Sequence, residues 1–228
     1  MVRKEDWGKA ISLHEWAPNL AFITAPLIVE LFTRHIPWRG IFLIIGTASL
    51  TIGVVYHRFG KGGEFHGASP NPRAVKKLIK NRNIWAMLFI FGLGIGGTIG
   101  IYNMLPLFLT SEKHFPSLWV NTIVGLSKAS GLVATLVSGW LTDKIGPRKT
   151  IALVFVTSGV SASLLGFFNG KILVALIFLQ SLFATCFFPP GFSALSSITG
   201  ERERNLAVSF TIPFAFVLGA GVIPSLIG

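Results

Sequence analysis

The chain has 228 residues, of which 51% are apolar and 13% are charged, and its mean hydropathy is +0.66. A soluble domain of this size needs more charge to cover its surface, so the composition excludes a soluble fold. The formal net charge is +11, but the basic residues punctuate apolar blocks instead of gathering on one surface. We therefore expect a membrane protein without a nucleic-acid partner.

The apolar residues fall in blocks that are long enough to cross a bilayer as helices, which takes roughly 20 residues. Strands of a membrane barrel would alternate over about ten residues, whereas these blocks are uniformly apolar, so we predict an all-α membrane protein. The single cysteine, Cys186, lies inside one block and predicts neither a disulfide nor a metal cluster. Seven transmembrane helices are predicted, over Leu13–Phe32, Trp38–Tyr56, Ile84–Leu109, Trp119–Leu141, Thr150–Phe168, Ile172–Ile198 and Ala207–Leu226.

The Lys and Arg residues support this count of spans. With the N-terminus in the cytoplasm, 15 of the 20 Lys and Arg residues fall in cytoplasmic segments, four fall in outside segments, and Lys128 lies within a span. Such an excess is typical of cytoplasmic loops, and a missed or invented span would destroy the alternation. We expect a multi-pass protein of the plasma (inner) membrane, with a cytoplasmic N-terminus and a C-terminus outside.

Residues 57–83 form the longest polar stretch and hold seven of the Lys and Arg residues. Their glycines and prolines predict a connection and not a span. The second half, residues 73–82, is predicted to be a basic segment at the membrane interface. We interpret residues 57–83 as a cytoplasmic basic linker.

The segment 139–149, GWLTDKIGPRK, lies between the fourth and fifth predicted spans. Gly139 permits close helix packing, Gly146 permits a tight turn, and Asp143 is a lone acid that could meet a cation or a helix N-terminus. An ordinary basic loop with one acid is the alternative that charge alone leaves open. The spacing is more specific, and it resembles the signature G-x-x-x-D-[RK]-x-G-x-[RK]-[RK] of the major facilitator superfamily of transporters. The matching residues are Gly139, Asp143, Lys144, Gly146, Arg148 and Lys149.

In that family the signature occurs after the second helix and again after the eighth. The basic linker two spans upstream implies that this is the second copy, and that the chain has a partial major facilitator fold with helices five to eleven. Residues 1–56 would be the last two helices of the N-terminal six-helix half, and residues 84–228 the first five helices of the C-terminal half. The remaining helices of the family fold would be missing, so we expect a truncated chain.

The resemblance also implies a contact between distant parts of the chain. In the family, the aspartate of this motif packs against the cytoplasmic start of helix five and stabilises the outward-open state. Asp143 is therefore expected to approach the backbone of residues 11–15, where free N–H groups and the helix dipole favour an anion. Ser12 is expected to cap that helix, and Arg148 is expected to be a second partner of Asp143.

Lys128 is the basic residue that lies deep within a predicted span, nine residues after Trp119. At about 1.5 Å per residue this places it about 13 Å into the bilayer, where an uncompensated lysine costs roughly 3 kcal/mol. A structural lysine paired with a carbonyl or an acid is the alternative. We favour a role in binding a substrate or a coupling ion.

Other polar residues within the spans allow two interpretations each. Asn103 continues a ridge of three glycines on its span, and either an interhelical hydrogen bond or a substrate contact would explain it. The same choice holds for Gln180. Pro189 and Pro190 must break the backbone ladder of their span, either for packing or because a discontinuous helix lines a transport cavity.

Glu15 and Asn19 lie at the cytoplasmic mouth of the first span. Glu15 could titrate with a transported proton, but an acid at a helix N-terminus is commonplace, and we favour the structural interpretation. Both residues are kept as candidates for the substrate or ion pathway, together with Lys128, Asn103 and Gln180.

The function that these features favour is transport of a small solute by alternating access, as a symporter driven by a proton or sodium gradient. ATP is not expected as the energy source, because the chain has no G-x-x-x-x-G-K-[ST] phosphate loop. Lys128 favours an anionic or carboxylate-bearing solute. The expected partners are this solute, a coupling ion and the lipid bilayer, and we expect no cofactor and no bound metal.

Three alternatives remain. The chain could be a truncated fragment that does not transport by itself. A seven-helix receptor is disfavoured because those families place the N-terminus outside. An intramembrane enzyme would need clustered catalytic groups, whereas isolated polar residues occur here, so we expect no enzyme activity.

Overall fold

The computed structural model describes residues 6–33, 35–60, 72–199 and 203–227, which form helices and no strands. The predicted all-α membrane fold is confirmed, because six helical stretches among these residues are long and apolar enough to span a bilayer. They are Trp38–Phe59, Arg82–Glu112, Trp119–Ile145, Pro147–Leu165, Gly170–Ile198 and Arg204–Leu226. They correspond to the second to seventh predicted spans, and the first coincides with α2 (Trp16–Thr33), which follows α1 (Trp7–His14).

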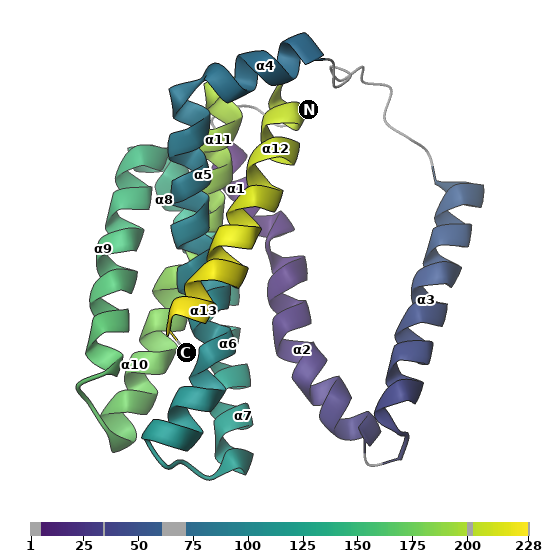
Figure 1. The fold of residues 1–228 in the computed structure, drawn as a ribbon, viewed down its shortest axis with the longest axis vertical. Helices are drawn as coiled ribbons and strands as arrows, with labels where there is room; N and C mark the ends of the chain where they lie inside the picture. Colours follow the sequence, from purple (N-terminus) through teal and green to yellow (C-terminus); the bar gives the residue numbers. More distant parts are fainter. Residues whose placement is uncertain (1–5, 34, 61–71, 200–202, 228) are drawn as a thin grey trace.

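Most of the helices form one bundle, and α3 stands apart from it (Figure 1). Within the bundle α5 packs on α12, and α9 packs on α10. α1 packs against α8 and α11. α2 packs against α7 and α8, and it also contacts α3. The helices after α2 are α3 (Trp38–Phe59), α4 (Pro72–Lys80), α5 (Arg82–Ile95), α6 (Ile101–Leu107), α7 (Ser117–Ser127), α8 (Ala129–Ile145), α9 (Pro147–Leu165), α10 (Gly170–Thr185), α11 (Phe188–Ile198), α12 (Arg204–Phe216) and α13 (Ile223–Ile227).

An aromatic cluster forms the centre of the bundle. Phe91 of α5 and Phe187, which lies between α10 and α11, are buried, and their ring centroids lie 5.1 Å apart in an edge-to-face arrangement. Gly94 makes room for this pair, because a Cβ at that position would overlap the ring of Phe187. Lipid tails are as apolar as these side chains, so close packing, and not exclusion of water, holds the helices together.

Gly92, Gly96 and Gly100, at the end of α5 and just after it, form a helix-packing face. A Cβ at Gly96 would lie 2.5 Å from Ile223 Cδ1, and a Cβ at Gly100 would lie 2.9 Å from Gly219 O. The ridge thus brings the backbone of the α5 stretch close to the last helical stretch of the chain.

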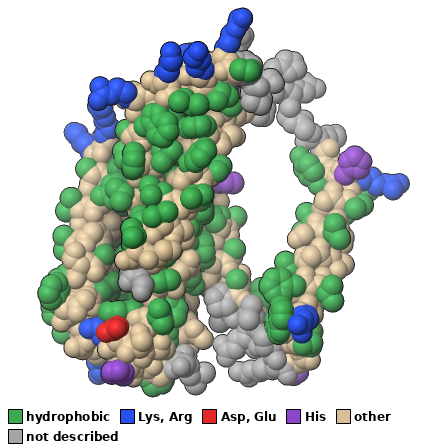
Figure 2. All heavy atoms as spheres, viewed as in Figure 1, with side chains coloured by type: hydrophobic (Ala, Val, Ile, Leu, Met, Phe, Trp, Pro, Cys, Tyr) green, Lys and Arg blue, Asp and Glu red, His purple; other side chains and the backbone are tan. Residues whose placement is uncertain are grey.

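α4 lies across one end of the bundle, beside the starts of α5 and α12 (Figure 1). It is the basic segment predicted at residues 73–82, while residues 61–71 of the predicted linker lie outside the described residues. Its Leu78 is buried and its Lys and Arg side chains are exposed. Blue side chains accordingly gather along this end in Figure 2.

Three contacts bring the segments that were predicted to be cytoplasmic to this same end. Asp143, in the last turn of α8, accepts a hydrogen bond from the N–H of Gly8. Lys77 of α4 pairs with Glu203 at 2.8 Å. The guanidinium of Arg204 lies over the ring of Trp7, 4.3 Å from its centre. We call this end of the bundle the α4 end. That the α4 end faces the cytoplasm remains a prediction.

Candidate functional site

Lys128 lies at the junction of α7 and α8, where the helix is interrupted. Its N–H donates to Gly125 O, and its own carbonyl accepts from Gly131 N. These three-residue steps tighten the turn, and they direct the side chain into the bundle, where 5% of it is exposed. The predicted mid-span lysine is therefore buried, at a break in its helix that the sequence analysis did not foresee.

The ammonium group of Lys128 has a carbonyl and two aromatic rings as neighbours. Its Nζ donates to Thr98 O at 3.1 Å and lies 4.7 Å from the ring centre of Tyr102 and 5.8 Å from that of Phe22. No Asp or Glu among the described residues forms an ion pair with it. The positive charge is therefore stabilised by dipoles and ring faces, without a compensating negative charge from the described part of the chain.

The carbonyl that Lys128 contacts belongs to a π-helical turn, η2 (Gly96–Gly100). The N–H of Ile101 bonds to Gly96 O, five residues back, so the backbone ladder is shifted by one residue. Such a bulge leaves carbonyls available to side chains, and π-bulges are frequent at functional sites. Gln180 Nε2 donates to Gly97 O at 2.8 Å, next to the carbonyl that Lys128 uses.

Lys128 and Gln180, which were predicted separately from different spans, therefore meet on adjacent carbonyls of one distorted turn. Sequence reasoning missed this turn. The signal that could have found it is the dense glycine cluster at residues 92–100, because glycine tolerates irregular helical backbone.

Asn19 lies on α2, which passes this site, and Glu15 lies just before the start of α2. A Cβ at Gly131 would lie 3.2 Å from Asn19 Oδ1, so Asn19 sits one turn of α8 away from Lys128. Glu15 separates α1 from α2 and is buried, with 6% of it exposed. Its backbone carbonyl accepts from Asn19 Nδ2 at 2.7 Å, and its carboxylate has no hydrogen-bond or ion-pair partner among the described residues. Glu15 is thus a buried acid at the junction of α1 and α2.

Asn103 does not join this group. It lies on α6, its side chain is exposed, and it forms no hydrogen bond with a described residue. The structure therefore brings together Lys128, Gln180 and Asn19, whereas Asn103 lies outside their contacts.

The motif aspartate holds the start of α1. Asp143 Oδ1 accepts from Gly8 N at 2.8 Å and Oδ2 accepts from Lys9 N at 3.1 Å. The expected contact with residues 11–15 is thus displaced by about one turn, because α1 begins at Trp7 and the free N–H groups of a helix lie in its first turn. The hydroxyl of Ser12 donates to Lys9 O and does not cap the helix, which corrects the prediction for Ser12.

The other motif residues shape the same corner of the molecule. A Cβ at Gly139 would lie 2.5 Å from Gly8 O, so this glycine allows α1 to touch α8. Gly146 has φ +88°, which glycine adopts without strain, and it turns the chain into α9. Lys144 lies over the ring of Trp140. Arg148 and Lys149 are exposed in the first turn of α9, and no ion pair joins Arg148 to Asp143, contrary to the expectation.

The proline pair interrupts its helix just upstream, between Thr185 at the end of α10 and Phe188 at the start of α11. Pro190 has no N–H, so the carbonyl of Cys186, four residues before it, loses its helical donor. The hydroxyl of Ser138 on α8 donates to that carbonyl instead. Pro189 and Pro190 are themselves buried, so the break faces the interior of the bundle.

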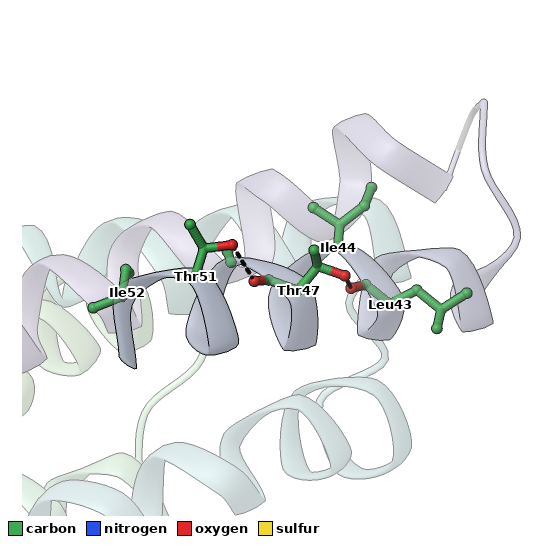
Figure 3. Close-up of a pocket in the computed structure, with 6 residues that line it drawn as sticks. Leu43, Ile44, Thr47, Thr51 and Ile52 are labelled. Atoms are coloured by element: carbon green, nitrogen blue, oxygen red, sulfur yellow. Dashed lines mark hydrogen bonds between the residues drawn. The ribbon is translucent and has the colours of Figure 1, made fainter. Parts of the chain in front are cut away.

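A shallow depression on α3 offers no comparable polar site (Figure 3). Leu43, Ile44 and Ile52 surround its two threonines. The hydroxyl of Thr47 donates to Leu43 O at 2.7 Å and that of Thr51 donates to Thr47 O at 2.8 Å. Both donors are therefore used within the helix, and the face is apolar.

Interrupted hydrophobic helices whose buried polar groups meet at mid-bundle define a class of multi-pass membrane protein typical of secondary transporters. The family model described as Major Facilitator Superfamily matches residues 1–144 and 119–228. The chain therefore belongs to the major facilitator superfamily, as the signature at residues 139–149 indicated.

Curated relatives agree with this membership. The chain is 23% identical over 157 residues to a phosphoglycerate transporter protein of Salmonella typhimurium, covering 66% of this chain and 34% of the relative. It is 24% identical over 123 residues to a probable nitrate/nitrite transporter, NarK2, of Mycobacterium tuberculosis, covering 52% of this chain and 31% of the relative. The matches thus span about a third of each relative's length, and no solved structure matches the chain.

Proposed function

We propose that this chain supplies part of the translocation pathway of a secondary transporter for a small anionic solute. The observation that carries the proposal is the buried ammonium group of Lys128. It lies among Thr98 O, Tyr102 and Phe22 without a carboxylate partner among the described residues.

Charge balance is the physical reason for an anion. An ionised group inside a bilayer is costly unless an opposite charge or several dipoles compensate it. One carbonyl and two ring faces supply part of this compensation. A bound anion would supply the rest, so the site favours an anionic solute over a neutral one of the same size.

The names of the relatives point the same way. Phosphoglycerate and nitrate/nitrite, the solutes in those names, are anions. They differ greatly in size, so they support the charge of the solute and not its identity.

Alternating access and ion coupling complete the proposal. The bond between Asp143 and the start of α1 ties the two parts of the chain together at one end, and its formation and release would accompany the change of access. The buried carboxylate of Glu15 is the candidate group for a coupling proton, with sodium symport as the alternative. We place the α4 end in the cytoplasm and the protein in the plasma or inner membrane.

Uptake into proteoliposomes tests the proposal. Vesicles that contain the protein should accumulate labelled phosphoglycerate or nitrate but not labelled glycerol, and an inward proton gradient should increase the accumulation. Lys128→Ala should abolish uptake, whereas Lys113→Ala should not. Lys113 is a matched control because it pairs with Asn169 at the opposite end of the bundle.

Uptake of glycerol equal to that of the anions would contradict anion selectivity. Binding of an anion without uptake by any vesicle would instead support the alternative that this chain does not transport by itself.

A further inference from the structure

A pair of aromatic rings shares the ammonium group of Lys128. Phe22 lies on α2 and Tyr102 on α6, and their ring centroids lie 5.8 Å apart in an edge-to-face arrangement. Lys128 Nζ lies 5.8 Å from the ring centre of Phe22 and 4.7 Å from that of Tyr102. The three side chains therefore form one cluster, in which each ring contacts both the other ring and the cation.

The cluster joins two parts of the chain that are distant in sequence. Tyr102 belongs to the helical stretch Arg82–Glu112. The same stretch holds Thr98, whose carbonyl accepts a hydrogen bond from Lys128 Nζ. Phe22 belongs to α2, which precedes the predicted linker at residues 57–83. Of these three neighbours of the ammonium, Phe22 is thus the one on the other side of the linker.

The contact with Phe22 is also the weakest of the three. The hydrogen bond to Thr98 O, at 3.1 Å, has an ordinary length. The ring of Tyr102 lies well within the limit of about 6 Å for a cation–π contact, whereas the ring of Phe22 lies close to that limit. A ring over a cation presents its negative face, so a ring and an anion compete for the same ammonium. Phe22 is therefore the neighbour that an anion displaces at the lowest cost in free energy.

We propose that Phe22 sets the anion affinity of the Lys128 site. Its ring lies over the ammonium while no solute is bound, and the negative group of the solute takes its place. This exchange also parts Phe22 from Tyr102 and so loosens α2 from α6. The inference rests on the proposed function, because it takes the solute to be an anion, and it adds the group with which that anion competes.

Replacing a competitor has an effect opposite in sign to replacing a supporting residue. Phe22→Leu keeps an apolar side chain but removes the ring, and with it the cation–π contact and the contact with Tyr102. Each such contact changes an equilibrium roughly two- to tenfold. Phe22→Leu is therefore expected to bind the anion about tenfold more tightly than the wild type, whereas loss of a purely structural residue would leave the affinity unchanged or lower it.

Isothermal titration with nitrate and with phosphoglycerate compares these affinities. Phe22→Leu should show the gain, whereas Phe22→Tyr, which keeps a ring, should bind as the wild type does. Phe214→Leu is the matched control. Phe214 also packs on a second ring, that of Phe210 at 5.2 Å, but no described cation lies over it. The affinity of Phe214→Leu should equal that of the wild type.

A second measurement leaves both rings intact, so the test stays decisive if Phe22→Leu does not fold. Spin labels are attached at Ala21 and Asn103, which are exposed and adjoin the two ring residues in sequence. Cys186→Ala is the background, because Cys186 is the single native cysteine. A saturating concentration of the anion that binds should lengthen the distance between the labels, and the same concentration should leave the distance unchanged in Lys128→Ala.

Anion binding by Phe22→Leu at or below the affinity of a wild type that binds would overturn the inference and leave the proposed function standing. An unchanged distance between the labels at saturating anion would overturn it as well. Absence of anion binding by both the wild type and Phe22→Leu would instead contradict the proposed function, and this inference with it.

Discussion

Asp143 is the side chain through which α8 holds the start of α1, and Asp143→Asn tests that role. The carboxylate accepts two backbone hydrogen bonds, at 2.8 Å from Gly8 N and 3.1 Å from Lys9 N. An asparagine keeps one acceptor oxygen but turns an NH₂ donor toward the second N–H. One bond is therefore lost, and the remaining one no longer has an ionised acceptor.

The magnitude follows from the kind of bond. Hydrogen bonds to charged groups contribute about 1.5–3 kcal/mol, with solvated ones at the low end. The bond to Gly8 is partly buried, and the bond to Lys9 is exposed. We expect docking of α1 to weaken by about 1.5–3 kcal/mol, which changes the ratio of docked to undocked protein by roughly tenfold or more.

Pulsed electron paramagnetic resonance measures this docking directly. Spin labels at Leu13 and Lys144, both exposed, report the distance between α1 and the end of α8. Asp143→Asn should broaden and lengthen the distance distribution, whereas Glu112→Gln, which removes an exposed acid elsewhere, should not. An unchanged distribution together with unchanged stability in Asp143→Asn would refute the reasoning.

Three further predictions concern packing, the helix break and topology. Gly219→Ala should destabilise the protein by about 1–3 kcal/mol in detergent unfolding, because its Cβ would overlap the facing α5 backbone, while Gly221→Ala, with nothing within 4 Å, should have little effect. Ser138→Ala should cost about 1–3 kcal/mol in the same assay by leaving the carbonyl before the prolines unpaired, and wild-type stability would show that another donor replaces the hydroxyl. Cysteines at Lys76 and Lys113 should label from opposite sides of sealed vesicles, and labelling from one side would contradict the proposed topology.

Hydrophobic block length was sufficient to predict the helical spans, because the bilayer fixes how many apolar residues a spanning helix needs. The first predicted span, Leu13–Phe32, coincides with α2, and the sequence analysis missed most of α1 (Trp7–His14), which precedes it. These residues mix Trp7, Ala10 and Ile11 with Gly8, Lys9 and Ser12, so hydropathy alone does not extend the span over them. They are helical next to Asp143, which satisfies two of their free N–H groups, and hydropathy carries no information about such a distant partner.

The candidate site was predictable as single residues but not as a group. A lone lysine within an apolar span signals burial, so Lys128 could be singled out. Its meeting with Gln180 depends on the π-helical turn η2 (Gly96–Gly100), whose shifted carbonyls receive both side chains. Hydrophobic periodicity does not distinguish this turn from an α-helix, and Asn103 was included because its polarity alone does not show that its side chain is exposed.

The central claim is that the charge of Lys128 contributes to binding an anionic solute. Isothermal titration of the purified protein with phosphoglycerate and nitrate tests it most directly, because it measures binding without requiring transport or ion coupling. The wild type and Lys113→Ala should bind at least one of the two anions with equal affinity. Lys128→Ala should lose this binding, and Lys128→Arg should recover part of it, since the guanidinium keeps the charge but differs in shape. Anion binding by Lys128→Ala at wild-type affinity would contradict the claim and leave Lys128 with a structural role.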